Sequence, residues 1–281
     1  MTKSTKYQDL IRNRISCRTY DSMPISLESI AKMEEKIAEL NQEAKTEVRF
    51  AIVSSLSDDR NAKAKLGTYG VMSGAHTFIE AIQDIETGDP LELGYLFEKA
   101  VLFATELGLS TCWLGGTFNR GNFEKSLTLT NNETIPIVSP IGYAKDKRSL
   151  LDSTMRFGAG SNHRKPWNEL FFENDSKTPL TKENAGKYEV ALEMVRLGPS
   201  ASNKQPWRLM KTGDDFHFFI QRNQGYGDMI RYDLQLNDLG IAKCHFELTL
   251  QESGIQGTWF TLDPQPKIEG WVYGCTYKCR V

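Results

Sequence analysis

Residues 198–207, GPSASNKQPW, are the part of this sequence with the clearest local architecture. Pro179 and Thr181 open a helical pattern that begins near Lys182 and stops at Gly198-Pro199. Pro206 then directs the chain into an extended strand. The small side chains between the two prolines allow the backbone to approach a flat ligand closely, although an ordinary helix-to-strand connection would also use such residues.

The pattern continues downstream as a hairpin and a long helix. Strands are predicted at 207–211 and 216–221, around a turn of sequence TGDD. A helix is predicted over 233–253, where Gly254 stops it, followed by a strand over 256–261.

The first half of the chain has the same order of elements. A helix is predicted over 27–40 with Ser26 as N-cap, followed by a strand at 48–54 and another within 71–82. A long helix over 91–107 ends at Gly108, and further strands are predicted at 110–114 and 135–144.

The two long helices superpose without gaps at a constant offset of 146 residues. The identical pairs are Leu93/Leu239, Gly94/Gly240, Leu102/Leu248, Glu106/Glu252, Gly108/Gly254 and Trp113/Trp259. We therefore predict an internally duplicated, single-chain pseudo-dimer of the α+β class, with mixed sheets flanked by helices. The predicted domains are an N-terminal half at 1–160, a linker at 161–178 and a C-terminal half at 179–281.

Composition excludes several classes of function. The formal net charge of the 281 residues is −2, which offers no general attraction for nucleic acid or anionic lipid. The N-terminus lacks an apolar signal core, and no uncharged apolar run reaches the roughly 18 residues of a membrane span. Five scattered cysteines are typical of a reduced compartment, so we expect a cytoplasmic protein. No metal-ligand spacing, P-loop or G-x-G-x-x-G motif occurs, so no metal site is predicted.

Three further stretches carry candidate ligand-binding groups. Residues 14–20, RISCRTY, place two guanidiniums and a hydroxyl at alternating positions that could grip a phosphate; a solvated basic surface is the alternative. Residues 112–116, CWLGG, leave a strand with paired glycines whose N–H groups could face a ligand, or form a plain turn. Arg164 lies in a basic cluster that by itself would be linker charge.

Taken together, these stretches resemble the FMN-dependent nitroreductase family, in particular its duplicated single-chain TM nitroreductases. The shared motifs are R-x-S-x-R-x-[FY] at 14–20, L-G-L-x-T-C-W-L-G-G at 107–116 and G-P-S-x-x-N-x-Q-P-W at 198–207. The resemblance covers nearly the whole chain and implies a nitroreductase-like fold.

The resemblance also implies roles for individual residues. Arg14, Ser16 and Arg164 would hold the phosphate and ribityl end of FMN, and Arg18 would lie near the flavin N1–C2 carbonyl edge. Leu114, Gly115 and Gly116 would line the N5 edge, to which the glycine N–H groups would point. The residues expected to wall the ring system from the other half are Pro199, Ser200, Ala201, Asn203 and Gln205. No catalytic side chain is expected, because the flavin carries the redox chemistry.

The implied activity is an FMN-dependent oxidoreductase that uses NADH or NADPH to reduce nitro compounds, quinones or similar small electrophiles by a ping-pong mechanism. One alternative is a flavin-binding carrier or sensor without turnover, for which bulky Trp113 or Phe118 would close the space above N5. Another is a duplicated relic that has lost FMN. Only the first half carries the R-x-S-x-R clamp and only the second carries the P-S-x-x-N wall, so we expect one FMN per chain and a monomer with its dimer interface internal.

Overall fold

The computed structural model describes residues 5–55, 68, 71–145, 163–223 and 232–280. The chain divides into two compact units, an N-terminal unit of residues 13–160 and a C-terminal unit of residues 1–12 and 161–281. Within the described ranges, no helix combines the length and apolar character that crossing a membrane requires. The division predicted from the sequence, with an N-terminal half at 1–160 and a C-terminal half at 179–281, stays a prediction.

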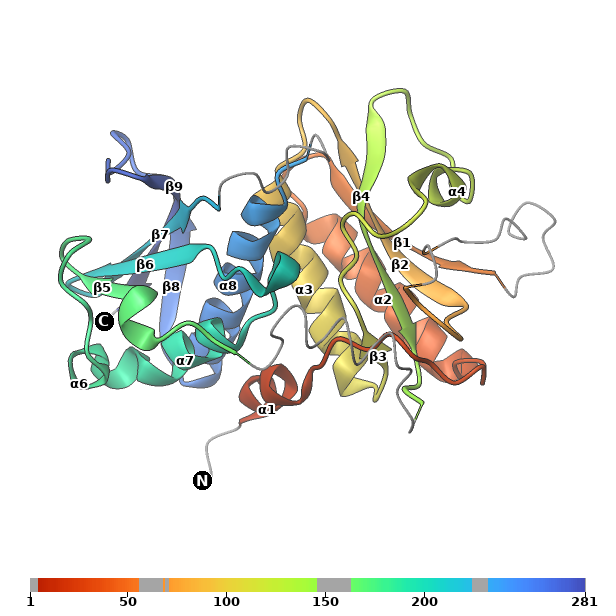
Figure 1. The fold of residues 1–281 in the computed structure, drawn as a ribbon, viewed down its shortest axis with the longest axis horizontal. Helices are drawn as coiled ribbons and strands as arrows, with labels where there is room; N and C mark the ends of the chain where they lie inside the picture. The colour runs from red at the N-terminus through yellow and green to blue at the C-terminus, as the bar shows by residue number, and fades with distance from the viewer. Residues whose placement is uncertain (1–4, 56–67, 69–70, 146–162, 224–231, 281) are drawn as a thin grey trace. The chain divides into compact units, whose positions relative to one another are not determined.

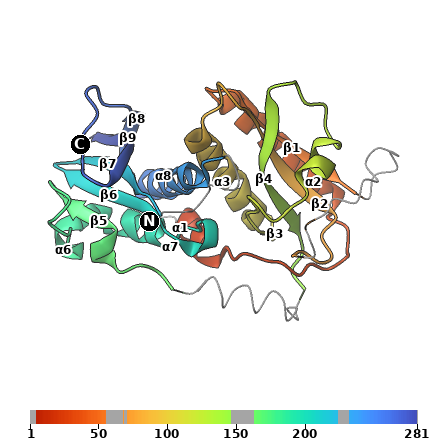
Figure 2. The ribbon, with the colours of Figure 1, turned by 45° about the horizontal axis from the view of Figure 1, so that its top comes forward.

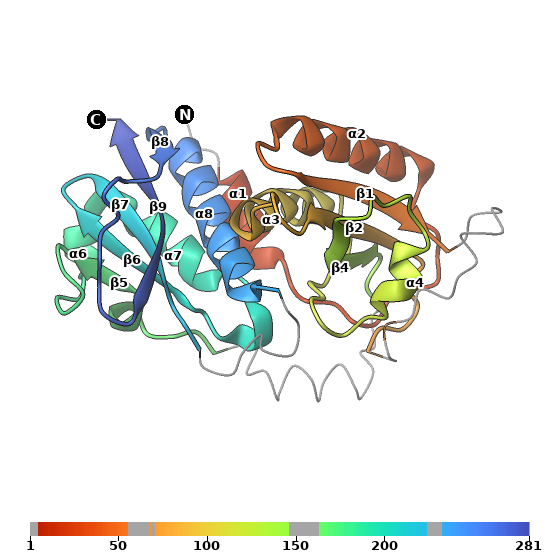
Figure 3. The same ribbon diagram turned by 90° about the horizontal axis from the view of Figure 1, so that it is seen from above.

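The N-terminal unit is built on a four-stranded sheet in the order β1-β2-β4-β3, with every neighbouring pair antiparallel. The strands are β1 (Val48–Ser54), β2 (Thr77–Asp84), β3 (Ser110–Thr111) and β4 (Glu133–Gly142). Helix α2 (Leu27–Glu43) lies on one side of this sheet and the short α4 (Arg120–Glu124) on the other (Figure 3). Strand β2 is therefore buried along nearly its whole length.

The helices of this unit begin and end where the local sequence directs. Ser26 caps α2 by accepting a hydrogen bond from the Ser29 N–H. Asp89 caps α3 (Pro90–Glu106) in the same way, with proline at its first position. Gly108, at φ +74°, then turns the chain out of α3 toward β3. These predicted helix boundaries are confirmed to within three residues.

The C-terminal unit has a five-stranded sheet in the order β5-β6-β7-β9-β8 (Figures 1 and 2). The strands are β5 (Phe171–Glu173), β6 (Trp207–Thr212), β7 (Asp215–Gln221), β8 (Gln256–Phe260) and β9 (Trp271–Arg280). The helices are α1 (Lys6–Asn13), α6 (Lys182–Ala185), α7 (Glu189–Leu197) and α8 (Leu234–Glu252). β5 pairs parallel with β6, and all other pairs are antiparallel, so this sheet is mixed.

The two units share one topology. The order β1-β2-β4-β3 matches β6-β7-β9-β8, with the same antiparallel pairings. In each unit a long helix lies between two strands along the chain: α3 between β2 and β3, and α8 between β7 and β8. Helices α3 and α8 end, and β3 and β8 begin, at the predicted offset of 146 residues. A duplication would produce this shared topology; the duplication itself stays a prediction.

Three elements differ from the sequence prediction. The helix expected over 182–197 is broken at Gly186, whose φ of +53° leaves a 3₁₀ turn (Gly186–Tyr188) between α6 and α7. The strand expected at 110–114 is limited to β3 plus an isolated bridge between Leu114 and Val138, because the Cys112 N–H donates to the side chain of Ser139 instead of the ladder. Strand β5 lies within the stretch expected to be linker.

Candidate cofactor site

The N-terminal motif runs in extended conformation beside β3. Ser16 forms a parallel bridge with Thr111, and the Cys17 N–H donates to the Thr111 carbonyl at 2.9 Å. On the other side, the Ser73 N–H donates to the carbonyl of Arg18 at 3.0 Å. The motif is thereby fixed along the strand that leads into Leu114, Gly115 and Gly116, so two of the predicted groups meet within this unit.

Arg14 is buried next to a carboxylate that the sequence prediction did not assign. Its side chain is 6% exposed, and its Nε lies 4.0 Å from Oε1 of the fully buried Glu98. Glu98 also accepts a hydrogen bond from the Trp113 indole N–H at 2.8 Å. The Nε and Nη1 of Arg14 have no hydrogen-bond partner among the described residues. Buried donors normally find acceptors, so an oxyanion at this guanidinium fits the unit.

Glu98 could have been noticed from the sequence. It is a charged residue within the apolar run of α3. A buried charge within such a run requires a partner, and the basic motif at 14–18 supplies one.

The glycine pair leaves the sheet immediately after a paired residue. Leu114 exchanges both backbone hydrogen bonds with Val138, at 2.9 and 3.0 Å. Gly115 and Gly116 lie beyond this bridge, and Gly116 is exposed. Within the described part of the chain, neither glycine N–H has an acceptor among the hydrogen bonds found.

The two bulky side chains near the glycine pair are engaged within their own unit. Phe118 is 5% exposed and stacks edge-on against Phe123, with ring centroids 5.3 Å apart. Trp113 packs edge-on against Phe97 at 4.6 Å while its N–H binds Glu98.

In the C-terminal unit, Arg164 is bound to the predicted wall. Its Nη1 donates to Asn203 Oδ1 at 3.1 Å, and its Nη2 donates to the Leu197 carbonyl at 3.2 Å. Asn203 in turn donates to the His163 carbonyl at 2.8 Å. Gln205 accepts from the Lys165 N–H at 2.8 Å. The amide side chains expected to face the cofactor therefore also hold the 163–165 segment against the wall.

The wall loop adopts an uncommon backbone. Ser202, Asn203 and Gln205 have φ values of +47°, +55° and +48°, in the left-handed region that disfavours residues with a Cβ. The Gln205 N–H donates to Ser200 Oγ at 2.9 Å, and the Ala201 N–H donates to Asp238 Oδ1 at 2.9 Å. Such a conformation persists only where the surroundings hold it in place.

Positive charge is concentrated around this loop. Arg208 is buried and donates to the carbonyls of Gln205 and Trp207, and burial lowers its pKa to about 10. The pKa of Lys165 is lowered as well, first by burial and then by the charges of Arg208 and Lys204. We refer to Arg164, Lys165, Lys204 and Arg208 as the basic cluster. The sequence prediction included only Arg164, because Arg208 and Lys204 gain significance only from their long-range neighbours.

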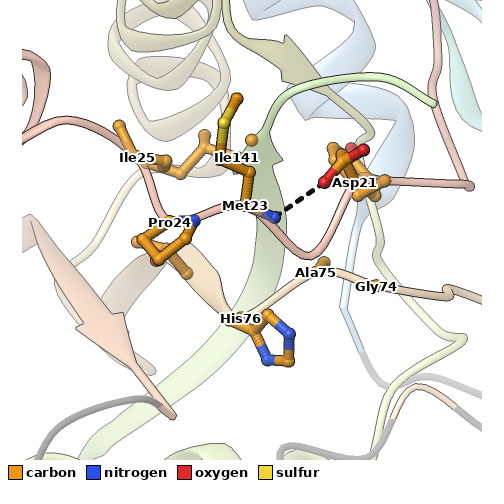
Figure 4. Close-up of a pocket in the computed structure, with 11 residues that line it drawn as sticks. Asp21, Met23, Pro24, Ile25, Gly74, Ala75, His76 and Ile141 are labelled. Atoms are coloured by element: carbon orange, nitrogen blue, oxygen red, sulfur yellow. Dashed lines mark hydrogen bonds between the residues drawn. The ribbon is translucent and has the colours of Figure 1, made fainter.

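A separate depression lies in the N-terminal unit (Figure 4). It is lined by residues 20–21, 23–25, 74–77 and 141–142. Its volume accommodates about one water molecule, which is far too small for a flavin. None of the predicted site residues lines it.

No group of His, Cys, Asp and Glu side chains suited to a metal ion occurs in the part of the chain that the structure describes. The predicted site residues of the N-terminal unit instead offer guanidiniums and backbone N–H groups, and those of the C-terminal unit offer a guanidinium and amides. This donor set suits an anionic ligand with polar ring edges, and FMN is such a ligand.

Comparison with known proteins identifies the family. A family model described as "Putative TM nitroreductase" matches residues 6–250. A protein of Thermotoga maritima MSB8 described as a putative nitroreductase is 20% identical, with a TM-score of 0.58 over 99% of this chain and 94% of its own, a likeness that shows the fold. An FMN-dependent nitroreductase of Clostridium difficile R20291 is 19% identical, covering 52% of this chain and 92% of its own, with a TM-score of 0.37.

A nitroreductase family protein of Clostridium novyi NT is 23% identical, covering 52% of this chain and 90% of its own, with a TM-score of 0.41. A search of curated proteins found no match. Since the family model spans most of the sequence, the chain belongs to the family described as putative TM nitroreductase.

Proposed function

We propose that the chain is an FMN-dependent oxidoreductase that takes electrons from NADH or NADPH and reduces nitro compounds, quinones or similar small electrophiles. FMN, when bound, supplies the redox chemistry and serves donor and acceptor in turn, which is a ping-pong mechanism. We further propose that one chain, without a second copy, is the functional unit.

The observation that carries the proposal is the buried guanidinium of Arg14, whose Nε and Nη1 have no hydrogen-bond partner among the described residues. Leaving a buried donor unpaired costs about 1–3 kcal/mol, so the sequence would retain this arginine at a cost unless a ligand used it. The FMN phosphate is an acceptor of suitable charge. The basic cluster of the C-terminal unit provides a second concentration of positive charge, consistent with the role proposed for Arg164.

The remaining residues are proposed to orient the ring system. The N–H groups of Gly115 and Gly116 would donate to one edge, and the fixed charge of Arg18 would favour negative charge at the opposite edge. The loop from Pro199 to Gln205 would provide a wall of small side chains. Charge and shape are thus supplied by the protein, and no protein side chain is assigned as a proton donor.

Packing also bears on the carrier alternative. That hypothesis requires Trp113 or Phe118 to cover the reactive edge. The hydrogen bond from Trp113 to Glu98 and the packing of Phe118 on Phe123 engage both side chains elsewhere. This supports turnover over simple flavin carriage.

The test is spectroscopic. Purified protein, or apo-protein supplemented with FMN, is expected to show a bound-flavin spectrum that bleaches when NADH or NADPH is added without oxygen and returns when a quinone is added. Absence of FMN binding would refute the proposal. Binding without bleaching by either nucleotide would establish the carrier alternative instead.

A further inference from the structure

The two long helices carry an acidic residue at the same place. Glu92 of α3 and Asp238 of α8 are 146 residues apart, the offset at which the helices superpose. Neither belongs to the identical pairs, so the sequence comparison did not single them out. Both residues accept hydrogen bonds from the backbone of a loop that follows the preceding helix.

In the N-terminal unit, this contact holds a short connection. Glu92 accepts from the Lys45 N–H at 3.0 Å and from the Thr46 N–H at 2.8 Å. The Thr46 hydroxyl adds a third bond at 2.6 Å. Both carboxylate oxygens are used, and the loop that they hold leads from α2 into β1.

In the C-terminal unit, the equivalent contact holds the wall loop. Asp238 Oδ1 accepts from the Ala201 N–H at 2.9 Å, and this loop leads from α7 into β6. Asp238 is only 3% exposed, and its Oδ2 has no hydrogen-bond partner among the described residues. Burial raises the pKa of Asp238 well above its ordinary value. A buried acid with an unused oxygen is costly, so its retention requires a reason beyond packing.

The loop itself supplies that reason. Three of its residues, Ser202, Asn203 and Gln205, are in the left-handed region. Ala201 precedes them directly, and its N–H is anchored on a helix that is almost entirely buried. Fixing Ala201 therefore limits the conformations available to the strained residues that follow it.

We infer that Asp238 is a positioning residue for flavin binding: it holds the loop from Pro199 to Gln205 in the conformation that receives the cofactor. Glu92 likewise accepts hydrogen bonds from the backbone of the corresponding loop in the other unit, and that loop lacks the P-S-x-x-N sequence. The contact is thus common to both units, and only its C-terminal version serves a ligand. This inference rests on the proposed function.

Three variants test it. Asp238→Ala removes the acceptor, Asp238→Asn keeps an oxygen for the Ala201 N–H, and Glu92→Ala is the matched control in the other unit. The readouts are FMN affinity, measured by quenching of flavin fluorescence, and hydrogen exchange at Ala201 and Thr46 in the apo-protein. Asp238→Ala is expected to weaken FMN binding about tenfold or more and to speed exchange at Ala201.

The controls separate positioning from general stability. Asp238→Asn is expected to restore FMN affinity to within about threefold of wild type. Glu92→Ala is expected to speed exchange at Thr46 and leave FMN affinity unchanged. Equal loss of affinity in Asp238→Ala and Glu92→Ala, or no loss in Asp238→Ala, would overturn the inference.

Two further outcomes are distinguishable. If Asp238→Ala does not fold, Ala201→Pro removes the donor while keeping the acid, and the same loss of affinity is expected; unchanged affinity would overturn the inference. The preceding Ser200 is already extended, as proline requires. If wild-type protein does not bind FMN, the proposed function fails, and exchange at Ala201 still reports whether Asp238 holds the loop.

Discussion

Replacing Glu80 by glutamine is expected to remove a strong pH dependence from the stability of the N-terminal unit. Glu80 lies in the middle of β2 and is fully buried, with Ala51 and Val138 opposite it on the neighbouring strands. Its Oε1 lies 2.9 Å from Ser126 Oγ, and its Oε2 has no hydrogen-bond partner among the described residues. Burial raises its pKa from 4.5 to about 8, and the bond to Ser126 offsets only part of this.

The hydroxyl of Ser126 is shared between two acceptors. Ser126 Oγ donates to Glu80 Oε1 at 2.9 Å and also lies 2.5 Å from the Phe123 carbonyl, which can only accept a hydrogen bond. Because one hydroxyl proton serves both acceptors, this contact compensates little of the cost of a buried negative charge on Glu80.

The size of the effect follows from linkage. Between pH 4.5 and 8 the folded state keeps the proton and the unfolded state loses it, so the free energy of unfolding falls as pH rises. The slope is about 1.4 kcal/mol per pH unit, which amounts to about 3 kcal/mol by pH 7 and about 4 kcal/mol by pH 8, where the folded state begins to lose the proton as well. Below pH 4.5 the contribution of the neutral acid is fully present. Glutamine does not titrate, so Glu80→Gln should gain on wild type by these amounts as pH rises.

Hydrogen exchange at the amides of β2 and β4 measures the unfolding free energy of this unit directly. Wild type, Glu80→Gln and the exposed control Glu86→Gln should be compared from pH 4.5 to 8.5, after correction for the intrinsic exchange rate. A difference between wild type and Glu80→Gln that stays constant with pH would refute the reasoning. It would mean that Glu80 is ionised in the folded protein.

Three other predictions concern the cofactor and the backbone. The double variant Arg14→Gln/Glu98→Gln is expected to weaken FMN binding about ten- to a hundredfold. The second substitution ensures that no buried carboxylate is left unpaired. Undiminished flavin content after dialysis would contradict the proposal that Arg14 binds the FMN phosphate. Titration of apo-protein with FMN is expected to saturate at one equivalent per chain, because the clamp and wall motifs each occur once; two equivalent sites would overturn that count. Gly257→Ala is expected to lower the melting temperature more than Gly254→Ala, because a Cβ at position 257 would overlap the Tyr277 ring. A Cβ at position 254 would meet open space, so Gly254→Ala should cost only the roughly 1–2 kcal/mol of placing alanine at a φ of +79°. Equal shifts in melting temperature would show that the overlap at position 257 is relieved.

The elements that the sequence predicted well have strong local signals. Strand β1 has the predicted bounds, and α8 lies within one residue of its predicted limits because Asp233 caps its start and Gly254 its end. The turn between β6 and β7 has Gly213 at φ +60°, as its composition required. Local chemistry alone determines these features.

The remaining features depend on contacts between distant segments. Cys112 leaves the ladder because Ser139, far along the chain, offers its hydroxyl. Likewise, the pairing of Arg14 with Glu98 joins two motifs that no local pattern connects. Motif spacing could identify the candidate binding groups, whereas the buried acids that support them became visible only once the fold had placed them.

The discontinuous composition of the C-terminal unit has a consequence for biosynthesis. Helix α1 leaves the ribosome long before Glu252, yet its Tyr7 N–H and its Gln8 side chain bind the carboxylate of Glu252, at 2.8 and 3.1 Å. Residues 13–160 can form their own core in the meantime, since domains generally fold as they are synthesised. The nascent chain must therefore carry α1 undocked until Glu252 has been synthesised, which exposes this helix to chaperones and proteases during that interval.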